Sequence, residues 1–123
     1  MQRSLDILLV EDDPVLGPLT AESLSECGHQ VTLSTTTKNA FEKLKVPHAF
    51  NVIILDIQIG TDRGEDLIER LNAAGIEFPA IVLFSAQPAS ELARSARAVN
   101  ASGTLQKPCS LEQINRMLER AVA

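Results

Sequence analysis

The sequence predicts an α/β protein: a doubly wound, five-stranded parallel sheet with five helices divided between its two faces. Two short runs of consecutive apolar residues, at positions 52–55 and 80–84, are typical of strands buried on both faces. Strand-like and helix-like segments alternate five times along the chain. Because parallel strands are joined by right-handed crossovers that normally contain a helix, this alternation favours a parallel sheet covered on both sides.

The length and composition indicate one globular domain, which we expect to span residues 1–123. Hydrophobic residues make up 45% of the chain and charged residues 22%, which argues against disorder. No apolar run approaches the roughly 20 residues that a membrane-spanning helix needs, and the first residues carry no cleavage signature. We therefore expect a cytoplasmic protein without a membrane partner.

The charge and the rare residue types exclude several classes of function. A formal net charge of −5 argues against direct binding to nucleic acid or to an anionic membrane, since both favour a basic surface. The chain has neither Tyr nor Trp, so it lacks the aromatic platforms of single-strand binders. Cys27 and Cys109 lie far apart without the spacing of metal ligands, and we expect buried or half-buried thiols.

The first strand is expected at residues 5–10, followed by a helix that stops at Gly28. Asp13 before Pro14 is a helix-start signature, because the carboxylate can cap free N–H groups and proline suits the first helical position. Pro18 removes one intrahelical hydrogen bond, which predicts a distorted first turn or a late start.

The middle of the chain contains the strand on which the prediction of the site depends. Alternating residues predict a short edge strand at Gln30–Ser34, and helical spacing predicts a helix at 37–46 that Pro47 ends. The buried strand is expected at 50–56, so that it closes on an aspartate. Residues 58–64 are predicted to form a loop, because the segment is rich in glycine, aspartate and threonine.

The last third repeats the alternation. A helix is expected at 65–74, a buried strand at Ala80–Ser85, and a helix at 88–100 that ends on an asparagine, a residue that tolerates the left-handed conformation. A short strand at Gly103–Gln106 and a final helix capped by Ser110 complete the chain.

Charged and polar side chains stand where four of the predicted strands end. They are Glu11, Asp12 and Asp13 after the first strand, Asp56 after the third, Ser85 at the end of the fourth and Lys107 after the fifth. The carboxyl ends of parallel strands share one rim of the sheet, where ligands bind in open α/β folds. Two carboxylates about 4 Å apart repel by roughly 4 kcal/mol at a surface-like dielectric, so cations are required. Lys107 supplies one positive charge, and Mg²⁺, which prefers oxygen ligands, would supply the rest.

Taken singly, most of these residues also fit ordinary structural roles. Asp13 is better placed to cap the first helix than to bind a ligand. Glu11 fits a solvated loop acid, Ser85 a hydroxyl that satisfies loop backbone, and Lys107 a surface lysine. Asp56 is the exception, because a carboxylate that closes a buried strand requires partners or a function.

In their order and position, these motifs resemble the receiver domains of response regulators in two-component signalling, over essentially the whole chain. The matching features are the acidic cluster after Leu8-Leu9-Val10, Asp56 after the third strand, Gly64 eight residues further on, Ser85-Ala86, and Lys107-Pro108. The resemblance implies a flavodoxin-like sheet with the strand order 2-1-3-4-5. It also implies a signalling module that catalyses at most its own phosphorylation and dephosphorylation.

The resemblance implies a role for each site residue. Asp56 would accept a phosphoryl group from a histidine kinase or a histidine phosphotransfer protein. The implied Mg²⁺ ligands are Asp12, Asp56, Glu11 (directly or through water) and the backbone carbonyl of Gln58. Lys107 and Ser85 would contact phosphoryl oxygens, since phosphoryl transfer depends on positioning and on neutralising charge. The small Ala86 would leave room for the phosphate.

Three departures from the family pattern affect the expected output. Ile59-Gly60 stands where the family usually has Met-Pro, and Cys109 replaces the usual aromatic residue after Lys-Pro. Thr104 occupies the position of an aromatic ring that swings inward on phosphorylation. We therefore expect Ser85 and the loop after it to transmit the conformational change caused by phosphorylation to the fourth helix. Partners would read it on the face of the fourth helix, fifth strand and fifth helix.

Three other functions are alternatives for a chain of this pattern. A pseudo-receiver, never phosphorylated and acting as a protein-binding module, predicts a broken acidic pocket. A flavin carrier of similar fold requires a Ser/Thr/Gly-rich phosphate loop after the first strand, where this chain has acids. An aspartate-nucleophile phosphatase requires a second acid two residues after the first, and Gln58 is not one. The sequence leaves open the cognate kinase, an attached output domain, and the oligomeric state, including a dimer formed on phosphorylation.

Overall fold

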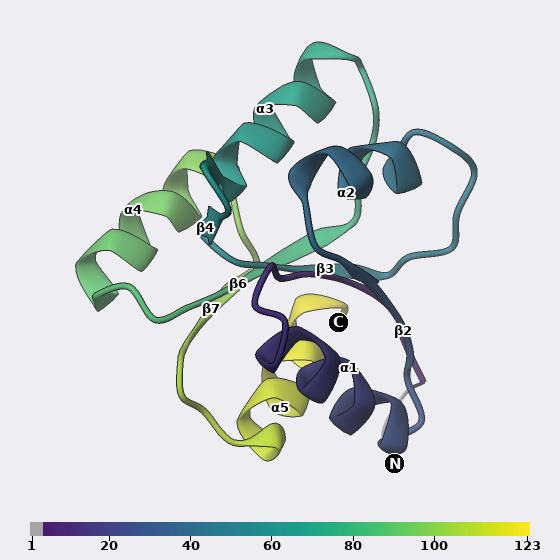
Figure 1. Cartoon of the computed structure of the whole chain (residues 1–123), viewed down its shortest axis with the longest axis vertical. Coiled ribbons are helices and arrows are strands. Elements are labelled where there is room, and N and C mark those ends of the chain that lie inside the picture. The colour runs from purple at the N-terminus through teal and green to yellow at the C-terminus, as the bar shows by residue number, and fades with distance from the viewer. Residues whose placement is uncertain (1–3) are drawn as a thin grey trace.

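A five-stranded parallel sheet runs through the centre of residues 4–123, the part of the chain that this computed structural model describes (Figure 1). Its strands are β1 (Asp6–Val10), β2 (Gln30–Ser34), β3 (Val52–Leu55), β6 (Ala80–Ser85) and β7 (Gly103–Gln106), in the order β2-β1-β3-β6-β7. The predicted order 2-1-3-4-5 is therefore confirmed, because β4 and β5 form a separate small hairpin outside the main sheet.

Helices cover both faces of the sheet, as the sequence predicts. One face carries α1 (Leu16–Glu26) and α5 (Leu111–Ala121), and the other carries α2 (Thr37–Leu44), α3 (Gly64–Ala73) and α4 (Ala89–Val99) (Figure 1). Successive side chains of a strand point to opposite faces. On β3, Val52 and Ile54 therefore pack in the core beside α1 and α5, while Ile53 and Leu55 pack in the core beneath α2, α3 and α4. Burial on both faces explains the uninterrupted apolar runs.

The first helix starts late, and this accommodates its proline. The Oδ1 of Asp13 accepts hydrogen bonds from the N–H groups of Val15 and Leu16, each at 2.8 Å, and these bonds lower the pKa of the Asp13 carboxyl. Because α1 begins at Leu16, Pro18 falls in the first turn, where an N–H has no intrahelical acceptor. The capping role of Asp13 and the late start are both confirmed.

The segment at 58–64, predicted as a loop, instead forms a short hairpin with two residues in each strand, so that prediction is wrong. Its strands β4 (Gln58–Ile59) and β5 (Asp62–Arg63) pair antiparallel. Gly60 has a φ of +60° at the first turn position, where a type II′ hairpin needs a positive φ. The Gln58 side chain closes the hairpin, since its Nε2 donates to the carbonyls of Gly60 at 2.8 Å and Asp62 at 3.2 Å. Strands this short leave no periodicity to detect.

Other boundaries differ from the predictions by one or two residues. The third strand ends at Leu55 rather than at Asp56, the second helix ends at Leu44 rather than at position 46, and α3 begins at Gly64. Asn100, with a φ of 55°, ends α4 in the left-handed conformation as expected. Within residues 4–123, no helix is both long and apolar enough to span a bilayer.

Gly64 holds the start of α3 against the backbone of the phosphoacceptor candidate. A Cβ on Gly64 would lie 2.2 Å from the backbone oxygen of Asp56, and the Gly64 N–H donates to the Ile57 carbonyl at 2.6 Å. Neither backbone group can move without disturbing the rim of the sheet. This close approach explains why glycine stands eight residues after Asp56.

We expect Gly64→Ala to lower the free energy of unfolding by about 2 kcal/mol or more, because the new methyl group overlaps backbone rather than a side chain. Urea unfolding of both proteins measures the loss. Gly103→Ala is the matched control: its Cβ would meet the Sδ of Met117 at 2.3 Å, and that flexible side chain can move aside. Equal losses in the two variants would contradict this interpretation.

Candidate functional site

The sheet register brings the predicted site residues to one rim. Val10 pairs with Leu55, so the ends of β1 and β3 are level, and Leu55 pairs with Leu83 of β6. The residues that follow Val10 and Leu55 are the acids. β6 ends two residues after Leu83 at Ser85, opposite Gln106 of β7, and Lys107 follows.

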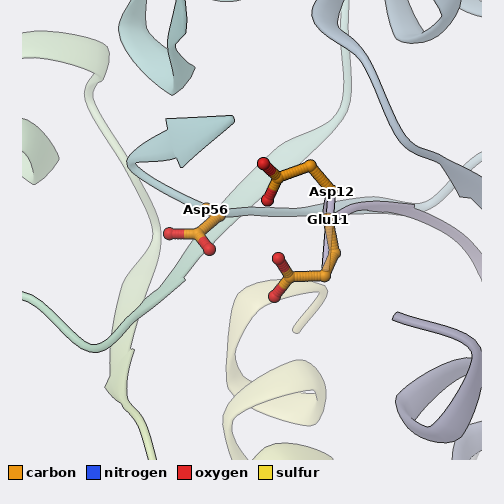
Figure 2. Close-up of side chains that lie close together, drawn as sticks. All are labelled: Glu11, Asp12 and Asp56. Carbon is orange, nitrogen blue, oxygen red and sulfur yellow. The ribbon is translucent and has the colours of Figure 1, made fainter. Parts of the chain in front are cut away.

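Three carboxylates converge at this rim. One oxygen of each of Glu11, Asp12 and Asp56 lies within 4.8 Å of the others. Figure 2 shows the side chains of Glu11 and Asp12 leaving consecutive residues after β1, with that of Asp56 beside them. Glu11 is only 3% exposed, Asp56 is half-buried and Asp12 is exposed. The group therefore reaches from the protein interior to the solvent.

Lys107 bridges two of these carboxylates. Its Nζ donates to the Oε1 of Glu11 and, at 2.9 Å, to the Oδ2 of Asp56. The Lys107 N–H donates to the Ser85 carbonyl at 2.9 Å, and the ammonium lies 5.1 Å from the centroid of the Phe84 ring. A backbone bond and a ring thus hold the side chain over the site. Phe84 was not identified from the sequence, where it counts only as one more apolar strand residue.

Burial and pairing shift the pKa of both charged partners. Burial raises the pKa of Glu11, although the Lys107 ammonium acts in the opposite direction. Burial tends to lower the pKa of Lys107, but the hydrogen bonds and charges of Glu11 and Asp56 outweigh it, so that pKa is raised. The ammonium therefore stays charged at neutral pH, where the carboxylates need it.

The hairpin after Asp56 holds Asp12 through its backbone. The Gly60 N–H donates to the Oδ2 of Asp12 at 2.7 Å, and the Gln58 N–H donates to the Oδ1 of Asp56 at 3.4 Å. A proline at position 60 would have no N–H to donate. The contact was not predicted from the sequence, although the replacement of the usual Met-Pro by Ile59-Gly60 was the signal that could have indicated it.

Ser85 is buried at the end of β6, and its hydroxyl orders the loop that follows. Its Oγ accepts from the Gln87 N–H at 3.4 Å, and the Gln106 Nε2 donates to the Gln87 carbonyl at 2.9 Å. The Ser85 hydroxyl proton remains available for an acceptor at the rim. The loop at 86–88 is thereby attached to both β6 and β7.

The donor set fits a magnesium ion. All three side chains offer hard oxygen ligands, they converge within bonding reach of one ion, and the exposed side of Asp12 leaves room for water. Asp13 is not part of this group, since its carboxylate caps α1. The role of the Gln58 carbonyl as a ligand stays a prediction, as do the individual roles of the other residues.

The geometry and the comparisons with known proteins point to the same class. The model of the response regulator receiver domain matches residues 7–119, so the chain belongs to that family. Members of this family act in two-component systems, with kinases or phosphotransfer proteins as partners, and typically bind Mg²⁺.

Two curated relatives cover most of the chain. Transcriptional regulatory protein CrdR of Helicobacter pylori is 31% identical over 115 residues, which span 93% of this chain and 53% of that protein. Two-component response regulator PprB of Pseudomonas aeruginosa is 27% identical over 121 residues, 96% of this chain and 44% of that protein. The chain thus spans about half the length of these relatives.

Solved structures of two similar proteins have the same fold as this chain. The non-phosphorylated HemR receiver domain from Leptospira biflexa superposes with a TM-score of 0.79 and 31% identity, covering 98% of this chain and 95% of that one. Chemotaxis protein CheY4 of Vibrio cholerae has a TM-score of 0.84 at 22% identity, covering 97% and 99% of the two chains, and this likeness shows the fold alone.

We expect Lys107→Met to lower the free energy of unfolding at pH 8 by about 2–3 kcal/mol in EDTA, because it leaves buried carboxylates without their cation. Without Lys107 the pKa of the Glu11 carboxyl rises further above its unfolded value. The stability of the variant therefore falls as the pH rises between those two values, and the loss is smaller at pH 5 than at pH 8.

Urea unfolding at the two pH values measures this dependence. Arg116→Met is the control, because it breaks the exposed pair with Glu112 and should change the stability by less than about 0.5 kcal/mol. A loss for Lys107→Met that is the same at both pH values would refute the account of the pairing.

Proposed function

We propose that this chain is a phosphoacceptor receiver domain, and that Asp56 takes the phosphoryl group from a histidine kinase or a histidine phosphotransfer protein. The observation that carries the proposal is the convergence of three carboxylates with Lys107 at the position of Asp56. Such an arrangement suits phosphoryl transfer, which depends on an in-line nucleophile and on neutralisation of the phosphoryl oxygens.

In the proposed reaction, an Asp56 carboxylate oxygen attacks the phosphorus of a phosphohistidine. The new O–P bond forms as the P–N bond breaks, and the electron pair of the P–N bond stays on the departing imidazole. Lys107 extends its hydrogen bonding from Asp56 to a phosphoryl oxygen, and the Ser85 hydroxyl donates to another. Bound at Glu11, Asp12, Asp56 and the Gln58 carbonyl, Mg²⁺ would supply the remaining positive charge.

We propose that the output begins at Ser85. Engaging its hydroxyl with the phosphoryl group would reorganise the Gln87 contact, and with it the loop at 86–88 that leads directly into α4. The short side chain of Ala86 leaves space for the phosphoryl group. Thr104 has no ring to reposition, so the signal on the α4, β7 and α5 face would come from the backbone and from α4 itself.

The phosphodonor must cover the rim, and the rim offers it an apolar surface. Val15, just before α1, and Leu19, within it, are 72% and 57% exposed. Leu19 borders a groove of about 250 Å³ between α1 and α5, which is lined mainly by apolar side chains, together with Thr20 and Ser23, and which shares Lys107 with the site. We propose that a helix bearing the phosphohistidine docks here. Relatives of about twice this length, one of them a transcriptional regulatory protein, suggest an output domain or a downstream protein as the next partner.

We expect incubation with acetyl phosphate and Mg²⁺ to add one phosphoryl group to the protein, detected by intact mass. Asp56→Asn removes the nucleophile while keeping the shape of the side chain, so it should show no addition, and EDTA should abolish the reaction of the natural protein. An unmodified natural protein under these conditions would overturn the proposal and favour a pseudo-receiver, a protein-binding module of the same fold.

We expect Leu19→Asp to slow phosphotransfer from a histidine phosphodonor protein at least about tenfold, because the carboxylate would be buried in an apolar contact. Phosphorylation by acetyl phosphate, which needs no docking surface, should be unchanged. Rates from both donors are compared by intact mass. An equal effect on both donors would place the defect in the site rather than in docking.

A further inference from the structure

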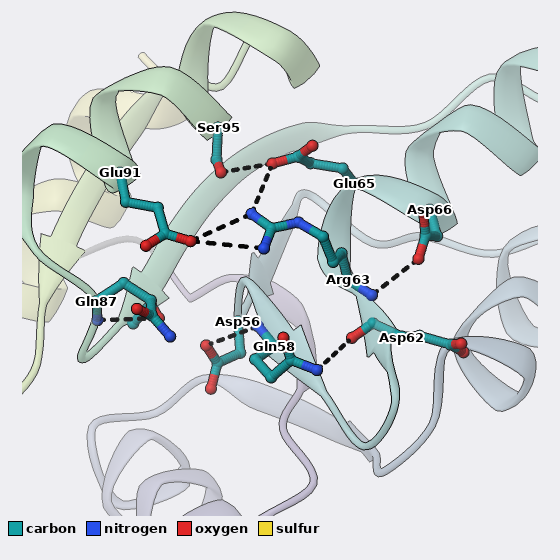
Figure 3. Close-up of polar contacts among 10 residues, drawn as sticks. Asp56, Gln58, Asp62, Arg63, Glu65, Asp66, Gln87, Glu91 and Ser95 are labelled. Atoms are coloured by element: carbon teal, nitrogen blue, oxygen red, sulfur yellow. Dashed lines mark hydrogen bonds and ion pairs between the residues drawn. The ribbon is translucent and has the colours of Figure 1, made fainter.

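Arg63 connects the hairpin after the phosphoacceptor to helix α4. Its Nη1 and Nη2 lie 3.5 Å and 3.4 Å from the same carboxylate oxygen of Glu91, in the first turn of α4. Nη2 also lies 3.3 Å from the Oε1 of Glu65, at the start of α3. Figure 3 shows the guanidinium between the two carboxylates, one from each helix. No other residue of the described hairpin makes a side-chain ion pair with α4.

A hydroxyl from the buried face of α4 completes this cluster. The Ser95 Oγ, in a residue 1% exposed, donates to the Glu65 Oε1 at 2.5 Å, and this bond is the main cause of a lowered pKa at Glu65. Glu65 therefore stays ionised between a cation and a hydroxyl. The pKa of Arg63 is raised, chiefly by its bond to Glu65. Both shifts favour the charged forms of Glu65 and Arg63 at neutral pH.

The opposite end of the hairpin touches the acidic site. The Gly60 N–H donates to Asp12, and the Gln58 side chain ties the carbonyls of Gly60 and Asp62 together. The backbone N–H of Arg63 donates to the Asp66 carboxylate at 2.8 Å, which fixes the hairpin to the first turn of α3. The hairpin is therefore held by hydrogen bonds along its length. Its turn contacts Asp12, and its last residue, Arg63, contacts Glu91.

We propose that Arg63 is a positioning residue that couples the carboxylate of Asp12 to α4 through the β4–β5 hairpin. The inference rests on the proposed function, since it adds a second route by which occupation of the site reaches α4, besides the loop after Ser85. Energetic coupling needs a physical link that both ends bias, and the ion pair between Arg63 and Glu91 is that link.

The strength of the link sets the size of the effect. The Arg63 and Glu91 side chains are partly exposed, at 42% and 30%, so their pair is screened by solvent. One such pair corresponds to about a two- to fivefold change in an equilibrium constant. Because coupling is reciprocal, breaking the pair from the α4 side should weaken the contact between the Gly60 N–H and Asp12, and should also change the affinity for Mg²⁺.

The test uses Arg63→Gln, Glu91→Gln and the double variant, with Arg116→Gln as the matched control that breaks an exposed Arg–Glu pair on α5. In metal-free protein, NMR-detected hydrogen exchange is followed at the Gly60 amide. Glu91→Gln should accelerate that exchange about two- to fivefold although it lies on another element, and the control should not. An unchanged Gly60 exchange rate in Glu91→Gln would overturn the inference.

Calorimetric titration with Mg²⁺ forms the second arm. Glu91→Gln should change the affinity about two- to fivefold, and Arg63→Gln, which also breaks the pair with Glu65, by at least that factor. The double variant should change it by no more than Arg63→Gln alone. Natural affinity in all three variants would overturn the coupling to the metal site. Failure of the natural protein to bind Mg²⁺ would instead refute the proposed function, while the metal-free exchange experiment would still decide whether the hairpin and α4 are coupled.

Discussion

The rim of this sheet is organised by the repulsion between carboxylates and its partial relief by one lysine. Parallel strands bring their carboxyl ends together whatever residues stand there, and in this chain those residues are acids. Lys107 contacts Glu11 and Asp56, but its single ammonium group stands against three carboxyl groups. In the proposed function, a cation and a phosphoryl group would stabilise each other at this rim, because their charges are opposite.

The parts of the fold that follow from periodicity were predictable. Uninterrupted apolar runs identified β3 and β6 as central strands, and the alternating β2 was correctly placed at an edge. Stops and caps were also predictable, because the left-handed Asn100 and the capping Asp13 act within a few residues of their own position. The residues of the site were identified by their position at strand ends, and the register then accounts for their proximity.

The features that were missed depend on contacts between distant parts of the chain. The β4–β5 hairpin has two residues in each strand, too few for a pattern, and its turn depends on the positive φ of Gly60. The contact of the Gly60 N–H with Asp12 joins residues 48 positions apart and uses a backbone group, which leaves no trace in side-chain chemistry. The two acidic partners of Arg63 lie on two different helices, so the sequence alone could not bring them together.

The close approach of Gly64 to the backbone of Asp56 makes α3 and α4 differ in how far each helix can move relative to the sheet. The first residue of α3 packs directly against the backbone of Asp56, so α3 cannot shift without displacing the residue that follows β3. α4 follows a loop, and in the described part of the chain its polar contacts with the neighbouring elements are made by side chains alone: the Ser95 hydroxyl with Glu65, and Glu91 with Arg63. Under the proposed function, a partner that distinguishes the phosphorylated from the unphosphorylated domain therefore has to contact α4, because α3 is fixed to the backbone of Asp56.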